Sequence, residues 1–109
     1  MNTKALGIKG EDMASVVLME KDYDIIARNY VTRIGEIDII AKKGDTLIFC
    51  EVKTRLSDSQ GKGREAVDQR KQEKIRRCAE IFLMSTWIPY EYCEFHVIEI
   101  SIDHLEACF

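Results

Sequence analysis

Apolar residues recur along the chain with two different periods, and these periods predict the order of the secondary-structure elements. Between Gly10 and Lys21 they fall on one side of a helix. The segments 23–31, 34–43 and 46–55 are rich in β-branched and aliphatic residues and predict three consecutive strands. A second helix and a final strand follow, over 64–85 and 92–102.

Two of the predicted strands, 34–43 and 46–55, are separated only by Gly44 and Asp45. A two-residue loop that starts with glycine is typical of a tight hairpin. In that register, we expect Asp38 to face Glu51 and Glu36 to face Lys53, with all four side chains on one face. The other face is then lined by apolar residues, namely Ile37, Ile39, Ala41, Ile48, Cys50 and Val52.

The order helix, three strands, helix, strand predicts an α/β fold with a central mixed four-stranded sheet. The long helix is expected to make a right-handed crossover to a parallel fourth strand. The chain has 109 residues, and we expect one domain over residues 1–109.

The composition is that of a globular protein, with 46% hydrophobic and 32% charged residues. No apolar run is long enough to cross a membrane, and residues 1–10 lack the apolar stretch that is typical of a signal peptide. We therefore expect a cytoplasmic protein without a membrane partner, whose four cysteines are free thiols.

Charge is distributed unevenly along the chain. The net charge is −3, but residues 53–77 carry a net positive charge and residues 78–109 contain no Lys or Arg. The basic block is a candidate phosphate-binding face, because local patches steer anions more than net charge does. The alternative is an ordinary solvated helix of mixed charge.

The predicted hairpin carries a candidate catalytic site. Two carboxylates that face each other in apolar strands are costly unless a cation lies between them. Asp38 and Glu51 would bind a hard divalent cation, Mg²⁺ or Mn²⁺, and Lys53 would stabilise charge developing on a phosphate. The alternative is a surface hairpin end with screened ion pairs.

Further residues could complete this site. Glu11 is a candidate third metal ligand, or an acid that complements the N-terminal dipole of its helix. Lys71 and Gln72 have an alternative role as polar residues at the inner edge of the long helix. The charged side chains on the rest of that helix favour simple exposure to solvent, and these are Arg64, Lys74, Arg76 and Arg77. The expected nucleic-acid contacts are Arg55, Lys62, Arg64, Lys71 and Gln72.

Several of these segments resemble the YraN-like protein family. They are KGEDMA at 9–14, ARNY at 27–30, GEIDIIA at 35–41, EVKTR at 51–55 and EAVDQRKQEKIRRCAEIFL at 65–83. The resemblance runs in order over nearly the whole chain. It implies the three-layer restriction-endonuclease-like fold of the PD-(D/E)xK nucleases, with archaeal Holliday-junction resolvases as structural relatives.

The resemblance also implies roles for individual residues. Asp38 would be the metal-binding aspartate, Glu51 the second acid and Lys53 the catalytic lysine. Glu11 matches an acid of the first helix and Gln72 a polar position of the long helix. Two positions depart from the family pattern: Glu94-Phe95-His96 replaces a segment such as RFD, and Asp22 stands where glycine is common, at a turn position that aspartate tolerates.

Three functions remain open from the sequence. The first is a metal-dependent endonuclease that hydrolyses phosphodiester bonds of DNA, including branched or flapped DNA, in repair or recombination. The second is a nucleic-acid-binding module that does not cut, and the third is a protein adaptor on the same fold. Branched substrates would call for a homodimer, and a protein partner would be another source of affinity for DNA.

Overall fold

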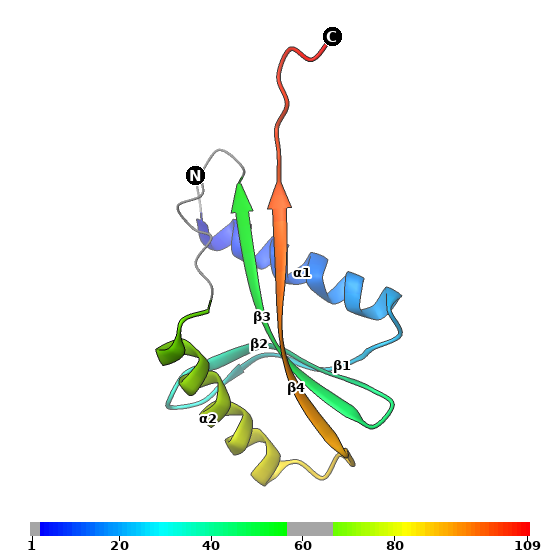
Figure 1. The fold of residues 1–109 in the computed structure, drawn as a ribbon, viewed down its shortest axis with the longest axis vertical. Coiled ribbons are helices and arrows are strands. Elements are labelled where there is room, and N and C mark those ends of the chain that lie inside the picture. The colour runs from blue at the N-terminus through cyan, green and yellow to red at the C-terminus, as the bar shows by residue number, and fades with distance from the viewer. Residues whose placement is uncertain (1–2, 57–66) are drawn as a thin grey trace.

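A computed structural model describes residues 3–56 and 67–109, with the side chain of Thr3 left out. The elements are α1 (Thr3–Glu20), β1 (Asp24–Val31), β2 (Glu36–Lys43), β3 (Thr46–Leu56), α2 (Gln69–Ser85) and β4 (Tyr92–Ile102). They form one four-stranded sheet in the order β1-β2-β3-β4, in which β3 and β4 are parallel and the other neighbours antiparallel. The predicted element order and the mixed sheet are confirmed (Figure 1).

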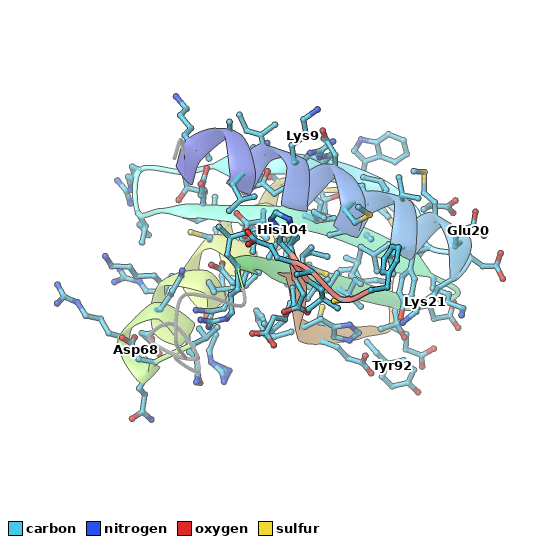
Figure 2. All side chains as sticks on the ribbon, turned by 90° about the horizontal axis from the view of Figure 1, so that it is seen from above. Lys9, Glu20, Lys21, Asp68, Tyr92 and His104 are labelled. Carbon is cyan, nitrogen blue, oxygen red and sulfur yellow. The ribbon has the colours of Figure 1, made fainter. Side chains whose placement is uncertain are left out.

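The two helices cover opposite faces of the sheet, and Figure 2 shows them on either side of the strands. Against α1 lies a buried cluster that includes Ala14, Leu18 and Ile39. Against α2 lies a second cluster that includes Phe49 and Phe82. The central strands β2 and β3 contribute to both clusters, because successive side chains of a strand point to opposite faces. The result is the three-layer restriction-endonuclease-like architecture.

The central hairpin forms in the predicted register. Gly44 has a φ of 59°, a conformation that glycine adopts without steric cost. The ladder between β2 and β3 runs from the pair Lys43–Thr46 to the pair Ile39–Cys50. It ends there, so the expected direct pairings of Asp38 with Glu51 and of Glu36 with Lys53 are not part of the ladder.

Beyond the pair Ile39–Cys50, β2 and β3 no longer pair with each other, while β2 stays paired with β1. The second half of β3 continues in register with β4 as far as Leu56–Ile102. Ile37 was expected on the face of Ile39, but it lies with Ile40 in the cluster beneath α2. Positions three apart do not share a face of a regular strand, so the alternation of β2 is interrupted beside Asp38.

The ends of both helices differ from the prediction. Helix α1 begins at Thr3, because Lys4, Ala5 and Leu6 are good helix formers. Helix α2 begins only at Gln69, because Asp68 has extended backbone angles and its side chain accepts a hydrogen bond from the backbone N–H of Lys71.

Asp22 follows α1 with a φ of 69°. This left-handed conformation after the last helical turn is usually taken by glycine, which explains the glycine of the family pattern.

Two further sequence predictions concern membrane-spanning segments and the state of the cysteines. No helix among the described residues is long and apolar enough to span a membrane. All four cysteines are free; Cys50 and Cys78 are buried, whereas Cys93 and Cys108 are exposed.

Candidate active site

Asp38 lies where β2 leaves β3, and it is buried, with only 7% of its surface exposed. Its Oδ2 accepts a hydrogen bond of 2.7 Å from the backbone N–H of Val52. Asp38 therefore satisfies a β3 donor just beyond the end of the β2–β3 ladder. This hydrogen bond fixes the Asp38 carboxylate to the backbone of β3, the strand that also carries Glu51.

The electrostatic environment of Asp38 favours its protonated form. Burial raises its pKa to about 6, the hydrogen bond from Val52 opposes this shift, and repulsion from Glu51, Glu11 and Glu36 adds to it. An acid that is buried among other acids is a site with surplus negative charge. Such a site is stabilised by a cation.

A lysine supplies one positive charge at this point. The Nζ of Lys71, in the first turn of α2, lies 2.5 Å from Oε1 of Glu51. The Glu51 side chain is 11% exposed and that of Lys71 is 49% exposed. The hydrogen bond to Glu51 raises the pKa of Lys71, burial opposes the shift, and attraction to Glu51 and Asp38 supports it. The sequence placed Lys71 among the nucleic-acid contacts, but here its ammonium pairs with the second acid of the site.

The acids and the start of α2 enclose a cleft of about 390 Å³. Glu36, Asp38 and Glu51 lie on its sheet side. The helix side carries the N-cap acid Asp68 and three cations, which are Arg70, Lys71 and Lys74. A cleft with an acid pair on its sheet wall and a surplus of cations on its helix wall can hold a phosphate diester together with a metal ion.

Two of these cations were not assigned to the site from sequence. The hydrophobic pattern of the sequence gives no signal for Arg70, and it favours solvated charge for Lys74. Both are exposed and also line the cleft. The spacing of 70, 71 and 74 could have revealed them, since residues three and four apart share one face of a helix.

Lys53 and Arg55 follow Glu51 on the same face of β3. Lys53 is half-buried and lies beside Glu99 in the register with β4. It is not among the residues that line the cleft of Asp38, so the structure does not bring the three predicted catalytic residues into one cavity.

Arg55 forms an ion pair with an acid of the last strand. Its Nε lies 2.6 Å from Oε1 of Glu99, although the N–H is not aligned for a hydrogen bond. The Arg55 side chain is only 13% exposed. Its predicted contact with nucleic acid stays a prediction, and Glu99 is a nearby acid that the sequence analysis missed.

Glu11 lies close enough to Asp38 to raise its pKa, but it faces a different set of partners. Burial raises the pKa of Glu11, and a hydrogen bond with the Asn29 side chain and attraction to Arg28 oppose the shift. Asn29 has a φ of 51° within β1. The idea that Glu11 complements a helix N-terminus is wrong, because α1 begins eight residues earlier, at Thr3.

Gln72 lies in a neighbouring cleft rather than in that of Asp38. Its Nε2 donates a hydrogen bond of 2.8 Å to the carbonyl oxygen of Val67. Lys62 and Arg64, the other two expected nucleic-acid contacts, lie outside the described residues.

The donor set fits a hard divalent cation. Among the residues that the structure describes, no three Asp, Glu, His or Cys side chains form a metal-binding group, so Glu11 does not complete a set with Asp38 and Glu51. Two carboxylates nevertheless suffice for Mg²⁺, which keeps several of its own waters and is commonly held by one or two acids plus substrate phosphate. Because Asp38 is buried among other acids, its ionised form is unfavourable, and a bound cation would offset that cost.

A mixed four-stranded sheet with one helix on each face is the architecture of a restriction-endonuclease-like α/β protein. Comparison with known proteins then gives the family. The model of the Uncharacterised protein family UPF0102 matches residues 10–100, and the chain belongs to this family.

Individual relatives match over nearly their whole length. A UPF0102 protein of Alkaliphilus oremlandii is 43% identical over 115 residues, which cover 97% of this chain and 98% of the relative. One of Dictyoglomus thermophilum is 41% identical, with 94% and 86% covered, and one of Moorella thermoacetica is 38% identical, with 97% and 88% covered.

Proposed function

We propose that this protein is a metal-dependent endonuclease that hydrolyses phosphodiester bonds of DNA. The observation that supports this most strongly is the cleft in which a buried Asp38 and Glu51 face the cations Arg70, Lys71 and Lys74. Buried acids that repel one another destabilise the folded protein, and they would also repel a phosphate in a site that only binds phosphate. Acids that hold a cation, beside cations that hold a phosphate, are what phosphodiester hydrolysis requires.

Each group then has a role. Asp38 and Glu51 would hold Mg²⁺ or Mn²⁺, which when bound polarises the phosphate and lowers the pKa of a water molecule. The three cations of α2 would hold the non-bridging oxygens of the substrate and exclude other orientations. Lys53 does not line the cleft, so it would have to reach the reacting phosphate from outside it, along the face of β3 that carries Glu51, to stabilise the charge that develops there.

The ion pair between Lys71 and Glu51 affects how the cation would enter. The ammonium group of Lys71 opposes the binding of a divalent cation at the same carboxylate, because the two positive charges repel. A turn of Lys71 away from Glu51 would relieve this repulsion, and its half-exposed side chain leaves room for that movement. In the turned position, it would bind substrate phosphate together with Arg70 and Lys74.

The test is cleavage of a labelled DNA panel in Mg²⁺ or Mn²⁺. The panel comprises linear duplex, single strand, flap and four-way junction. Wild type is compared with Glu51→Ala, Lys53→Ala and the matched control Lys43→Ala, which removes a lysine from the opposite end of the same hairpin. Metal-dependent cutting that both site variants lose and the control keeps would establish the nuclease.

The alternative is a module that binds DNA without cutting it. It is favoured by the two-acid metal set, since the described residues offer no third acid to hold a catalytic cation. Binding without cutting in the same panel would support this alternative. If the protein neither binds nor cuts any DNA of the panel, a protein partner becomes the leading hypothesis.

A further inference from the structure

A second cleft, of about 250 Å³, adjoins the acidic cleft and shares Glu51 and Ile75 with it. It lies between α2 and β4. The other lining residues are Phe49, Val67, Gln72, Arg76, Phe95, His96 and Val97. Unlike the acidic cleft, it is lined mainly by apolar and aromatic side chains.

Its aromatic side is formed by two stacked rings. Phe49 belongs to the core, and the Phe95 ring lies 5.5 Å from it, centroid to centroid, at an interplanar angle of 29°. Phe95 remains 46% exposed. The guanidinium carbon of Arg76 lies 5.4 Å from the centre of the Phe95 ring. Since every base offers a π face, a base could stack on the guanidinium plane of Arg76 or take its place over the exposed part of the Phe95 ring.

Polar groups stand at the edge of this cleft. Gln72 donates to the Val67 carbonyl, and His96 lies 2.9 Å from a carboxylate oxygen of Glu94. Amide and imidazole groups can hydrogen-bond the edge of a base, and they would do so without demanding one particular base. A pocket with an apolar body and a few polar groups has the usual character of a small-ligand site.

We propose that this cleft binds an unpaired nucleobase next to the phosphate that the acidic cleft holds, so that the substrate is single-stranded, flapped or branched nucleic acid. The shared residue Glu51 places the two clefts side by side, as a phosphate and its adjoining base require. A base-paired nucleotide keeps both faces in the duplex stack, so it cannot present one to Phe95 unless it leaves the helix. The proposal rests on the proposed function for the phosphate cleft and adds the substrate class.

The cations favour a nucleic acid over a second copy of the chain as the occupant. Arg76 overhangs Phe95, and Lys71 and Lys74 of the same helix line the neighbouring cleft. β4 and the segment after it, residues 92–109, carry acids and no Lys or Arg. The cations of α2 therefore attract a polyanion such as nucleic acid. A second copy of the chain would need an acidic surface placed against these cations to gain the same attraction.

The test measures binding of two fluorescein-labelled probes of equal length, an oligothymidine and a blunt DNA duplex, without divalent metal. Phe95→Leu removes the π face but keeps an apolar side chain, and Arg76→Met removes the guanidinium while leaving the ring. Tyr92→Leu is the matched control, since it removes an exposed aromatic from the same strand outside the cleft. We expect Phe95→Leu to weaken oligothymidine binding by about 5- to 100-fold, with duplex binding and the Tyr92→Leu control unchanged.

A second readout does not depend on affinity. An oligonucleotide that carries 2-aminopurine should lose fluorescence on binding wild type and the control, through stacking, and retain it with Phe95→Leu. Circular dichroism of each variant checks that it is folded, and Arg76→Met repeats the test if Phe95→Leu does not fold.

Several outcomes would overturn the proposal. They are equal binding of oligothymidine by wild type and both cleft variants, an equal loss of single-strand and duplex binding, and no binding of oligothymidine by wild type. A wild-type dimer that Phe95→Leu dissociates without changing DNA binding would identify a second copy as the occupant instead. Selective loss of single-strand binding in a protein that cuts no DNA would support the base cleft while the proposed nuclease function fails.

Discussion

Replacing Asp38 by asparagine should stabilise the metal-free protein at neutral pH. The amide oxygen of the new side chain can still accept the N–H of Val52, so the substitution removes the charge and retains the hydrogen bond. The wild-type carboxylate is buried near three other acids, which together with burial raise its pKa to about 6 from the ordinary value of 3.8. Ionised Asp38 is therefore a cost to the folded state.

The magnitude follows from linkage. The rise of the Asp38 pKa from 3.8 to about 6 corresponds to roughly 3 kcal/mol, at about 1.4 kcal/mol for each pH unit. In the folded protein Asp38 stays protonated up to higher pH than in the unfolded chain, so its contribution is fully present below about pH 4. It is lost as the pH rises through about 6. The Asp38→Asn variant lacks this loss, and its advantage should grow from near zero at about pH 4 to at most about 3 kcal/mol at about pH 8.

Urea unfolding of wild type and Asp38→Asn between about pH 4 and about pH 8 checks this. Other carboxylates titrate in both proteins, so the difference between the two curves isolates Asp38. The control Asp103→Asn removes an exposed aspartate and should leave the curve unchanged. Mg²⁺ should stabilise wild type and not Asp38→Asn. A difference that is independent of pH, or a less stable Asp38→Asn at the alkaline end, would refute the electrostatic account.

Three further predictions concern the packing of α1 at Gly10, the ion pair of Lys71 with Glu51, and the residue that follows α1. A side chain at Gly10 would clash with Thr54 Oγ1, so Gly10→Ala should destabilise by about 1–2 kcal/mol in urea unfolding, whereas Gly7→Ala, with open space, should stabilise by up to about 1 kcal/mol. Lys71→Met should bind Mn²⁺ about threefold to tenfold more tightly in calorimetry, because no ammonium competes for the acids. Asp22→Gly should raise stability by about 0.5–1 kcal/mol in thermal unfolding, because glycine relieves a left-handed backbone.

Each of these has an outcome that contradicts it. Equal effects of the two glycine substitutions would show that α1 does not approach β3 closely at Gly10. Unchanged or weaker Mn²⁺ binding by Lys71→Met would mean that the lysine does not compete with the metal. A loss of stability in Asp22→Gly would place that residue outside the left-handed region.

The sequence by itself determined the elements and the hairpin register. Alternating aliphatic residues and a glycine at the turn are local signals, and they predicted β2, β3 and β4 within two residues at each end. The hairpin also placed the acids near one another before any tertiary contact was known. The helix starts were less accurate, because the start of α2 depends on the backbone angles and the side-chain hydrogen bond of Asp68.

Only the tertiary structure decided how the site is assembled. Whether Lys71 meets Glu51 depends on where α2 crosses the sheet, which no periodicity encodes. The end of the β2–β3 ladder, which turns Asp38 toward the N–H of Val52 and opens the cleft, depends on the whole sheet. The stacking of Phe95 on Phe49 likewise follows from the parallel pairing of strands far apart in sequence. Local patterns indicate which face a residue occupies as long as the strand is regular, which fails for Ile37 in β2, whereas distances between elements arise from packing of the complete chain.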